Sequence, residues 1–356
     1  MIYRNQNGAD TLSESPAVSV VMSVYNAEAF LAAAVDSVLK QTFTDFEFII
    51  IDDASDDESA EILRSFDDPR IRLYRNDVNL GLTVSLNRGL RLARGKYVAR
   101  LDADDFCKPQ RLGVQHEYLE AHPECAVLGS AVDFVDEKNE FLRKAERPTS
   151  FADILASCFF HNPCWHSTVM FRRVSVTDLG GYDESFERGQ DYDLWLRMIA
   201  AGREIRNLPL ALASFRMHES KVTYTDSDRA AECRLRAVQR GLQKVLGIRT
   251  STRNLQIIHE LRMRGHADCT VVELFRLWML LRCFYGRFKA QFADLDGAVT
   301  ALEKRLDKLI GFSCRDGYLR ESFVHPYVKG KGLVVCATKA CVRVPDILRR
   351  EVQRRT

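Results

Sequence analysis

The chain has 356 residues, of which 46% are hydrophobic and 28% charged, as in globular proteins that bury a core. Such a length forms one large domain with an appendage, or two domains. The sequence has no run of about 18 uncharged apolar residues, which excludes a membrane-spanning helix, and its polar start does not resemble a secretory signal. Ten cysteines without a C-x-x-C pair favour reduced thiols over disulfides or zinc. We therefore expect a cytoplasmic protein.

The net charge of +2 hides an asymmetry between the two parts of the chain. Residues 231–356 contain 25 Lys and Arg against 12 Asp and Glu, a balance of +13, and residues 1–230 contain 26 against 37, a balance of −11. A basic C-terminal part suits an anionic surface, so we expect a peripheral contact with the inner face of a membrane. Charge without a recognised motif does not support a nucleic-acid partner.

After a polar tail over residues 1–15, short apolar runs alternate with segments of helical spacing. This alternation predicts an α/β fold, in which helices cover both faces of a mainly parallel sheet. The predicted strands span residues 18–24, 46–51, 71–74 and 97–101, with another from 126, and the predicted helices span 28–39, 56–66 and 82–93, with another opened by Pro109.

The alternation breaks down after about residue 130. Strand-like segments remain at 167–171 and 211–217, separated by a helical pattern at 191–200. From about residue 226 the sequence is basic and mainly helical. We therefore predict three parts, which are the tail of residues 1–15, a domain of residues 16–225 and a C-terminal region of residues 226–356.

Polar side chains follow three of the predicted strands at the point where each strand ends. These are Tyr25 and Asn26, the pair Asp52 and Asp53, and the cluster at 102–105. In sheets of this kind ligands bind beyond the carboxyl ends of the strands, so we expect the three groups to lie together. Asn26 is in addition a plausible cap for the helix that follows it.

The cluster Leu101-Asp102-Ala103-Asp104-Asp105 places three carboxylates at the end of a strand. Like charges this close repel one another unless a cation or strong donors stabilise them. Mg²⁺ usually takes one or two carboxylates together with the phosphates of a substrate. The cluster therefore indicates a metal–diphosphate site, and the alternative is a solvated Asp-rich turn that caps the next helix.

Six motifs occur in the order seen in inverting family 2 glycosyltransferases, which the chain resembles over residues 18–220. The resemblance is to bacterial members that build surface polysaccharide or lipopolysaccharide. The motifs are VVMSVYN at 20–26, IDDAS at 51–55, NLGL at 79–82, LNRG at 86–89, ARGKY at 93–97 and LDADD at 101–105.

The resemblance implies a GT-A fold for residues 16–225 and an enzyme that moves a sugar from a nucleoside-diphosphate donor, with a UDP-sugar favoured. The acceptor would be a hydroxyl of a glycan or of a lipid-linked molecule, and the cofactor Mn²⁺ or Mg²⁺. Asp104 is the expected direct metal ligand, and Asp102 binds the ribose or the metal's water shell. His218 matches a family position that completes the metal shell, and the alternative for it is a surface hydrogen-bonding residue.

The resemblance also implies which residues hold the nucleotide. Asp53 would accept the N–H of uracil or thymine, and its alternative role is to cap the helix over 56–66. Arg88 would reach a phosphate, and its alternative is an exposed helical arginine. The other expected donor-binding residues are Val24, Tyr25 and Asn26 around the base and ribose, together with Asn79 and Asn87.

Asp191 lies where the family carries its general base, although Gln190 replaces the glutamate that usually precedes it. One carboxylate opposite the leaving group can remove the acceptor proton in an in-line displacement. The alternative role for Asp191 is a helix cap. His166 and Trp165 fall in the stretch that faces the acceptor in similar enzymes, and core packing is the alternative for Trp165.

The segment 274–285 mixes apolar and cationic residues at helical spacing. This suits a helix on an anionic membrane, and equally a helix packed on the catalytic domain or in a homodimer. Two other functions remain open at this level. A sugar-phosphate nucleotidyltransferase shares the architecture but needs a Gly-rich basic loop that residues 23–26 lack, and an inactive nucleotide-sugar-binding scaffold would have lost one of the carboxylates.

Overall fold

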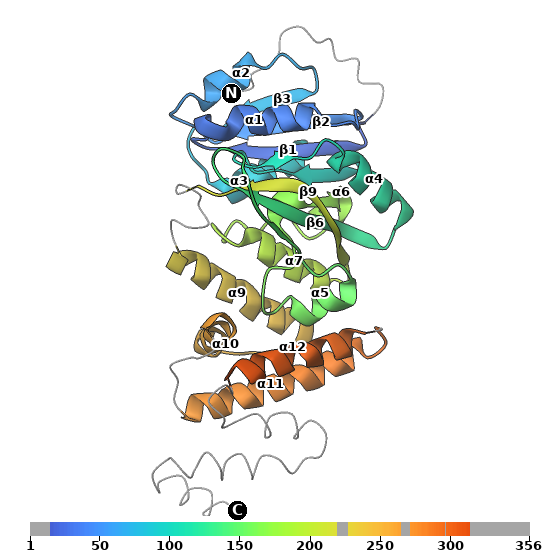
Figure 1. Ribbon diagram of the computed structural model, residues 1–356, viewed down its shortest axis with the longest axis vertical. Helices are drawn as coiled ribbons and strands as arrows, with labels where there is room; N and C mark the ends of the chain where they lie inside the picture. Colours follow the sequence, from blue (N-terminus) through green and yellow to red (C-terminus); the bar gives the residue numbers. More distant parts are fainter. Residues whose placement is uncertain (1–14, 219–226, 265–270, 296, 314–356) are drawn as a thin grey trace, which may run out of the picture. The chain divides into compact units, whose positions relative to one another are not determined.

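The computed structural model describes residues 15–218, 227–264, 271–295 and 297–313 (Figure 1). The predicted tail, apart from its last residue, and the end of the C-terminal region from residue 314 lie outside the described residues. The chain divides into two compact units, with the boundary between Arg249 and Thr250.

The first unit follows the predicted order of elements closely. Its strands are β1 (Val18–Val24), β2 (Phe46–Asp52), β3 (Ile71–Arg75), β4 (Tyr97–Arg100), β5 (Phe106–Cys107), β6 (Cys125–Val135), β7 (Phe141–Ala145), β8 (Met170–Arg172) and β9 (Glu204–Arg216). Its helices are α1 (Glu28–Leu39), α2 (Ser59–Ser65), α3 (Leu82–Leu92), α4 (Arg111–Ala121), α5 (Phe151–Ser157), α6 (Arg173–Thr177), α7 (Gln190–Ala200) and α9 (Ser227–Leu246), with a 3-10 turn η1 (His166–Thr168).

One nine-stranded sheet runs in the order β3-β2-β1-β4-β8-β6-β9-β5, and β7 pairs with β6 at its side. The strands β1 to β4 are parallel, as predicted, so their carboxyl ends meet at one edge. The rest of the sheet is mixed, because β8 is antiparallel to both β4 and β6, whereas β6 and β9 are parallel. The mainly parallel character predicted from the sequence therefore describes the first half of the sheet.

The core of this unit is formed where β1 and β2 are buried on both faces. Val20, Met22 and Val24 on β1 pack in one cluster with Leu31 and Val35 of α1. These residues are fully buried because the helices cover the sheet, and burying a large aliphatic side chain contributes about 1.5–3 kcal/mol. The apolar runs that were predicted to be strands therefore form the buried layer of the sheet on which the polar loops lie.

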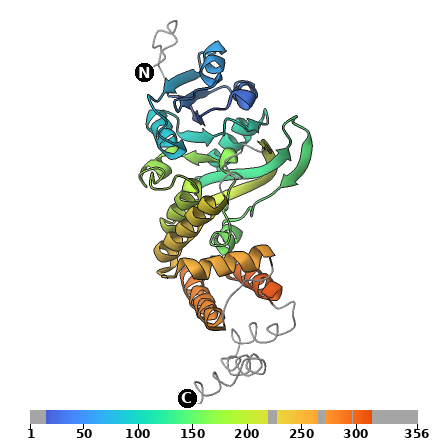
Figure 2. The same cartoon turned by 90° about the vertical axis from the view of Figure 1, so that its left-hand side faces the viewer.

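The first unit extends past the predicted domain boundary at residue 225, because α9 packs along α7 (Figures 1 and 2). Gly241 permits this close approach. A Cβ atom at Gly241 would lie 2.8 Å from Leu196 Cδ1, closer than real contacts allow. The start of the basic region is thus part of the sheet-containing unit.

The second unit contains α10 (Thr252–Arg264), α11 (Val271–Phe292) and α12 (Ala298–Ser313). The apolar face of α11 is buried within this unit at Leu277, Leu281, Phe284 and Phe288, where α10 and α12 pack against it. The helix of the 274–285 segment therefore packs on helices of its own unit, an arrangement that the sequence alternatives did not include. Among the described residues, no helix is both long and apolar enough to cross a membrane.

Candidate active site

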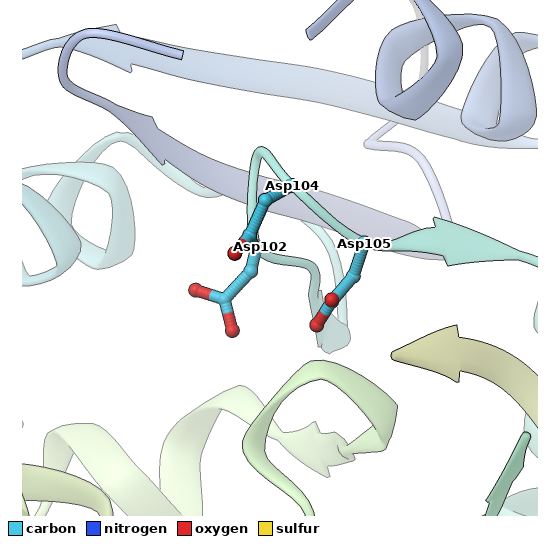
Figure 3. A group of neighbouring side chains, drawn as sticks. All are labelled: Asp102, Asp104 and Asp105. Carbon is cyan, nitrogen blue, oxygen red and sulfur yellow. The ribbon is translucent and has the colours of Figure 1, made fainter. Parts of the chain in front are cut away.

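The acidic cluster follows β4 in a short loop at the carboxyl edge of the parallel strands. Figure 3 shows Asp102, Asp104 and Asp105 projecting from this loop to the same side. One oxygen from each carboxylate lies within 4.8 Å of the others. Asp105 is fully buried, and Asp102 and Asp104 are partly exposed. Carboxylate oxygens at this spacing can bind one hard divalent cation.

The 3-10 turn η1 holds the cluster from the opposite side. The Oγ of Ser167 lies 2.5 Å from Asp102 Oδ2 and 2.5 Å from Asp105 Oδ2. The backbone N–H of Arg216 donates to Asp105 Oδ1 at 3.0 Å, which ties the end of β9 to the same loop. The cluster is thus fixed between β4, η1 and β9.

His218, just beyond β9, lies beside the cluster. Its Nε2 is 3.0 Å from Asp104 Oδ2, and its ring packs against Phe30 with centroids 4.7 Å apart. A neutral imidazole together with carboxylates is a donor set that suits Mn²⁺, and the carboxylates alone suit Mg²⁺. The residues present therefore fit the predicted cation, with Asp104 and His218 side by side although 114 positions separate them.

Asp191 lies in the first turn of α7. The helix begins at Gln190 after Gly189, whose φ is 67°, so Asp191 does not cap it. The Nδ2 of Asn162 donates to Asp191 Oδ2 at 2.7 Å, and the N–H of Tyr192 donates to Oδ1 at 2.8 Å. Burial raises the pKa of Asp191 above its usual value of 3.8, against the opposing effect of the Asn162 hydrogen bond.

The pKa of Asp191 is lowered by the charge of Arg100 and raised by that of Asp102, so both residues lie within electrostatic range of the start of α7. Arg100 is only 1% exposed and forms an ion pair with Asp102. Its Nη1 donates to Ser167 Oγ at 3.2 Å. Neither Arg100 nor Ser167 was predicted as a site residue, and the only sequence signal for them is their position beside the acidic motif and the predicted acceptor stretch.

The predicted acceptor residues lie on and next to η1. His166 Nε2 is 2.9 Å from Tyr182 Oη, and burial lowers the pKa of His166 well below its usual value. Trp165 packs edge-on against Phe134 with ring centroids 5.5 Å apart, and Arg147 Cζ lies 3.8 Å from the centre of its ring. Trp165 therefore does pack as the alternative interpretation expected, and its contact with an acceptor stays a prediction.

Asp53 is 1% exposed and faces the loop before α3. Asn76 Nδ2 and the N–H of Leu80 donate to its Oδ1 at 2.6 and 3.0 Å, and the N–H of Gly81 donates to Oδ2 at 2.8 Å. Gly81 has φ of 87°, a conformation that favours glycine. Asp53 does not cap α2, which begins at Ser59 after Glu58. Its contact with a nucleotide base stays a prediction.

Val24, Tyr25 and Asn26 connect β1 to α1 at the same edge. The carbonyl of Val24 accepts the N–H of Asp53 at 2.8 Å, and Tyr25 is 49% exposed. Asn26 has φ of 49°, and its Oδ1 accepts the N–H of Asp56 at 3.0 Å. The prediction that Asn26 caps α1 was wrong, because this side chain holds the 52–56 loop and Ala27 precedes the helix.

The remaining predicted donor residues serve the framework around α3. Asn79 Oδ1 accepts the N–H of Gly81 at 3.0 Å. Asn87 donates to the carbonyl of Tyr182 and accepts its N–H, both at 2.9 Å. Arg88 donates to the carbonyl of Arg75 at 2.9 Å, so it contacts the end of β3. A role in donor binding stays a prediction for these three residues.

Comparison with known proteins assigns the family. The model of glycosyl transferase family 2 matches residues 19–180. An O-antigen biosynthesis glycosyltransferase of Escherichia coli, WbnJ, is 30% identical over 64% of this chain and 89% of its own length. The chain belongs to glycosyl transferase family 2.

Other family 2 relatives differ in how much of their length is matched. An uncharacterized glycosyltransferase of Methanocaldococcus jannaschii is 38% identical over 52% of this chain, and the chain spans just under two thirds of it, 66%. The E. coli UDP-Glc:alpha-D-GlcNAc-diphosphoundecaprenol beta-1,3-glucosyltransferase WfaP is 28% identical over 58% of this chain and 79% of its own length.

Solved structures show that the fold is GT-A, as the resemblance implied. Staphylococcus aureus TarS, in complex with UDP-GlcNAc, aligns with a TM-score of 0.55 at 17% identity over 88% of this chain and 92% of TarS. The mannosyltransferase PcManGT of Pyrobaculum calidifontis, with GDP-Man and Mn²⁺, aligns with a TM-score of 0.52 at 17% identity over 87% and 85%.

Proposed function

We propose that this family 2 glycosyltransferase moves a sugar from a UDP-sugar to a hydroxyl of a glycan or lipid-linked acceptor, with inversion at the anomeric carbon. The reaction would serve cell-surface polysaccharide synthesis, on the inner face of the membrane. The observation that supports it best is the carboxylate cluster of Asp102, Asp104 and Asp105 with His218 beside it, which lies within electrostatic range of the buried Asp191.

Asp191 would remove the proton of the acceptor hydroxyl. Burial makes its carboxylate more basic than an exposed one, because the charged form is less well solvated. Asn162 donates to one oxygen and leaves the carboxylate oriented. The start of α7 adds a favourable field for the ionised form, since a helix N-terminus carries partial positive charge.

Asp104 and His218 would hold the divalent cation, with Asp102 on its water shell or on the donor ribose. When bound, Mn²⁺ or Mg²⁺ supplies positive charge that neutralises the leaving diphosphate. The chain's own contribution is to keep the three carboxylates together between Arg100, Ser167 and the end of β9. The printed ligands of TarS and PcManGT, which are UDP-GlcNAc and GDP-Man with Mn²⁺, support a nucleotide-sugar donor.

The names of the relatives support the acceptor class. WbnJ acts in O-antigen biosynthesis, and the name of WfaP states a diphosphoundecaprenol acceptor. Family membership disfavours the nucleotidyltransferase alternative. The inactive-scaffold alternative predicts a damaged centre, whereas Asp53, Asp102, Asp104 and Asp191 are all present.

Hydrolysis of a donor panel tests the proposal directly. Purified protein is incubated with UDP-, GDP- and dTDP-sugars, with and without Mn²⁺, and released nucleotide is measured. We expect metal-dependent release from a UDP-sugar, increased by a lipid-linked glycan acceptor. No release from any donor, and no binding of UDP by calorimetry, would contradict the proposed function.

A further inference from the structure

Arg100 is a buried cation that the family assignment does not explain. Its guanidinium pairs with Asp102 through Nη2 and donates to Ser167 through Nη1, whereas its Nε has no hydrogen-bond partner among the described residues. Burying a charge is costly unless it is paired and hydrogen-bonded. The guanidinium of Arg100 is therefore held by Asp102 and Ser167, next to the acidic cluster.

The oxygen atoms around Arg100 indicate what its positive charge does at the site. Ser167 Oγ lies 2.5 Å from a carboxylate oxygen of Asp102 and 2.5 Å from one of Asp105. A hydroxyl has one proton, so it can donate to only one of these oxygens at a time. The guanidinium of Arg100 contacts both Ser167 and Asp102, so it places positive charge beside these crowded oxygens.

A second buried arginine shows how specific this contact is. Arg216 is 2% exposed and acts electrostatically on Asp104 and Asp105. Its Nη2 donates to Asn139 at 2.8 Å, and its guanidinium lies 4.4 Å from the ring centre of Phe30. Arg100 is thus the arginine that forms an ion pair with the cluster among the described residues.

We propose that Arg100 is a positioning residue whose charge, held beside Asp102, opposes a divalent cation in the cluster, and thereby makes cation binding depend on the diphosphate of the donor. This inference rests on the proposed function. A cation that enters the cluster meets a guanidinium already paired with Asp102, on the water-shell side of the site, and the two positive charges repel. The diphosphate brings negative charge that offsets this repulsion, so cation and nucleotide bind best together.

Charge-neutral variants separate this role from a structural one. Arg100→Gln keeps a polar group that can contact Asp102 and Ser167, and Arg100→Met repeats the charge removal if Gln does not fold. Arg100→Lys keeps the charge. Arg72→Gln is the matched control, because Arg72 is paired with Glu47 at the opposite end of β2.

The measurement is the affinity for Mn²⁺ alone and for Mn²⁺ in the presence of UDP, by calorimetry, with melting curves to establish folding. Removing one positive charge next to the cluster is expected to tighten binding of Mn²⁺ alone on the order of 10-fold, from Coulomb's law in a partly solvated site. The gain in Mn²⁺ affinity on adding UDP should shrink by a similar factor. Arg100→Lys and Arg72→Gln should behave as the unmodified protein.

Two outcomes would overturn proposals at different levels. A folded Arg100→Gln or Arg100→Met protein with unchanged or weaker affinity for Mn²⁺ alone would overturn the role of Arg100, even if its melting temperature fell. An unmodified protein that binds no Mn²⁺ with or without UDP would instead overturn the metal dependence in the proposed function.

Discussion

Two groups of aspartates lie at the same edge of the sheet, and their surroundings differ. Asp52 and Asp53 receive donors from all sides, including Arg75 at 2.6 Å on Asp52 and three N–H groups on Asp53. The cluster at 102–105 instead has three carboxylates packed against one another, with the hydroxyl of Ser167 between two of them and Arg100 paired with Asp102. Carboxylates saturated with donors hold the backbone, and carboxylates crowded together have capacity for a cation.

The largest expected effect concerns Asp191, which we propose as the general base. Asp191→Asn should lower turnover by a factor on the order of 10² to 10⁴, since the amide cannot accept the acceptor's proton, while UDP binding stays nearly intact. The assay is steady-state transfer with calorimetry of UDP. Burial raises the pKa of Asp191, so its ionised form destabilises the fold at pH values above the usual pKa. The melting temperature of Asp191→Asn should therefore not fall below that of the unmodified protein. Unchanged turnover would contradict the proposal that Asp191 is the general base.

Asp104→Ala should abolish the metal-dependent part of UDP binding, because the carboxylate next to His218 is lost. Its melting temperature should stay the same or rise, since one of three mutually repelling charges is gone. Calorimetry of UDP with Mn²⁺ and a melting curve give both values. Normal affinity for UDP with Mn²⁺ would count against Asp104 as a metal ligand.

The matched substitution in the pair Asp52 and Asp53, whose carboxylates are fully hydrogen-bonded, should lower the free energy of unfolding. Asp53→Ala leaves the Asn76 amide and the N–H groups of Leu80 and Gly81 without their acceptor, which should cost about 2 to 3 kcal/mol of unfolding free energy. Urea denaturation measures this. Equal losses of unfolding free energy in the Asp53 and Asp104 variants would contradict the proposal that the two groups of aspartates have different roles.

The smallest effect is a shift in pH dependence. Asn162→Ala removes a donor that favours the ionised form of Asp191, so the pKa of Asp191 should rise further. Activity needs the ionised base and falls as pH drops through this pKa. The acid limb of kcat/KM should therefore move to higher pH by about 0.5 to 1 unit. A limb that stays in place would show that another group controls it.

The sequence predicted the first half of the fold well, because β1 and α1 coincide with the apolar and helical patterns at 18–24 and 28–39. It predicted the second half less well. Whether β8 and β6 run parallel or antiparallel depends on long-range pairing that local patterns do not encode. The packing of α9 on α7 also depends on a contact between Gly241 and Leu196, which no periodicity reveals.

Within the site, motif order pointed to Asp104 and His218, which the structure brings to 3.0 Å. It missed Asn162, Tyr182 and Arg100, since none carries a spacing that signals chemistry. Their importance comes from contacts with residues distant in the chain, such as the hydrogen bond from Asn162 to Asp191. Asp53 accepts three hydrogen bonds from the loop before α3, which its acidic motif did not reveal, and its contact with a nucleotide base stays a prediction.

The bonds from α3 to the segment 182–186 have a practical consequence for redesign. The side chain of Asn87 hydrogen-bonds to both the backbone N–H and the carbonyl of Tyr182, and Thr83 donates to the carbonyl of Phe186 at 2.6 Å. The helix that starts at the glycine turn therefore also anchors the chain leading to α7. Directed evolution that keeps α7 in place should therefore leave Thr83 and Asn87 unchanged.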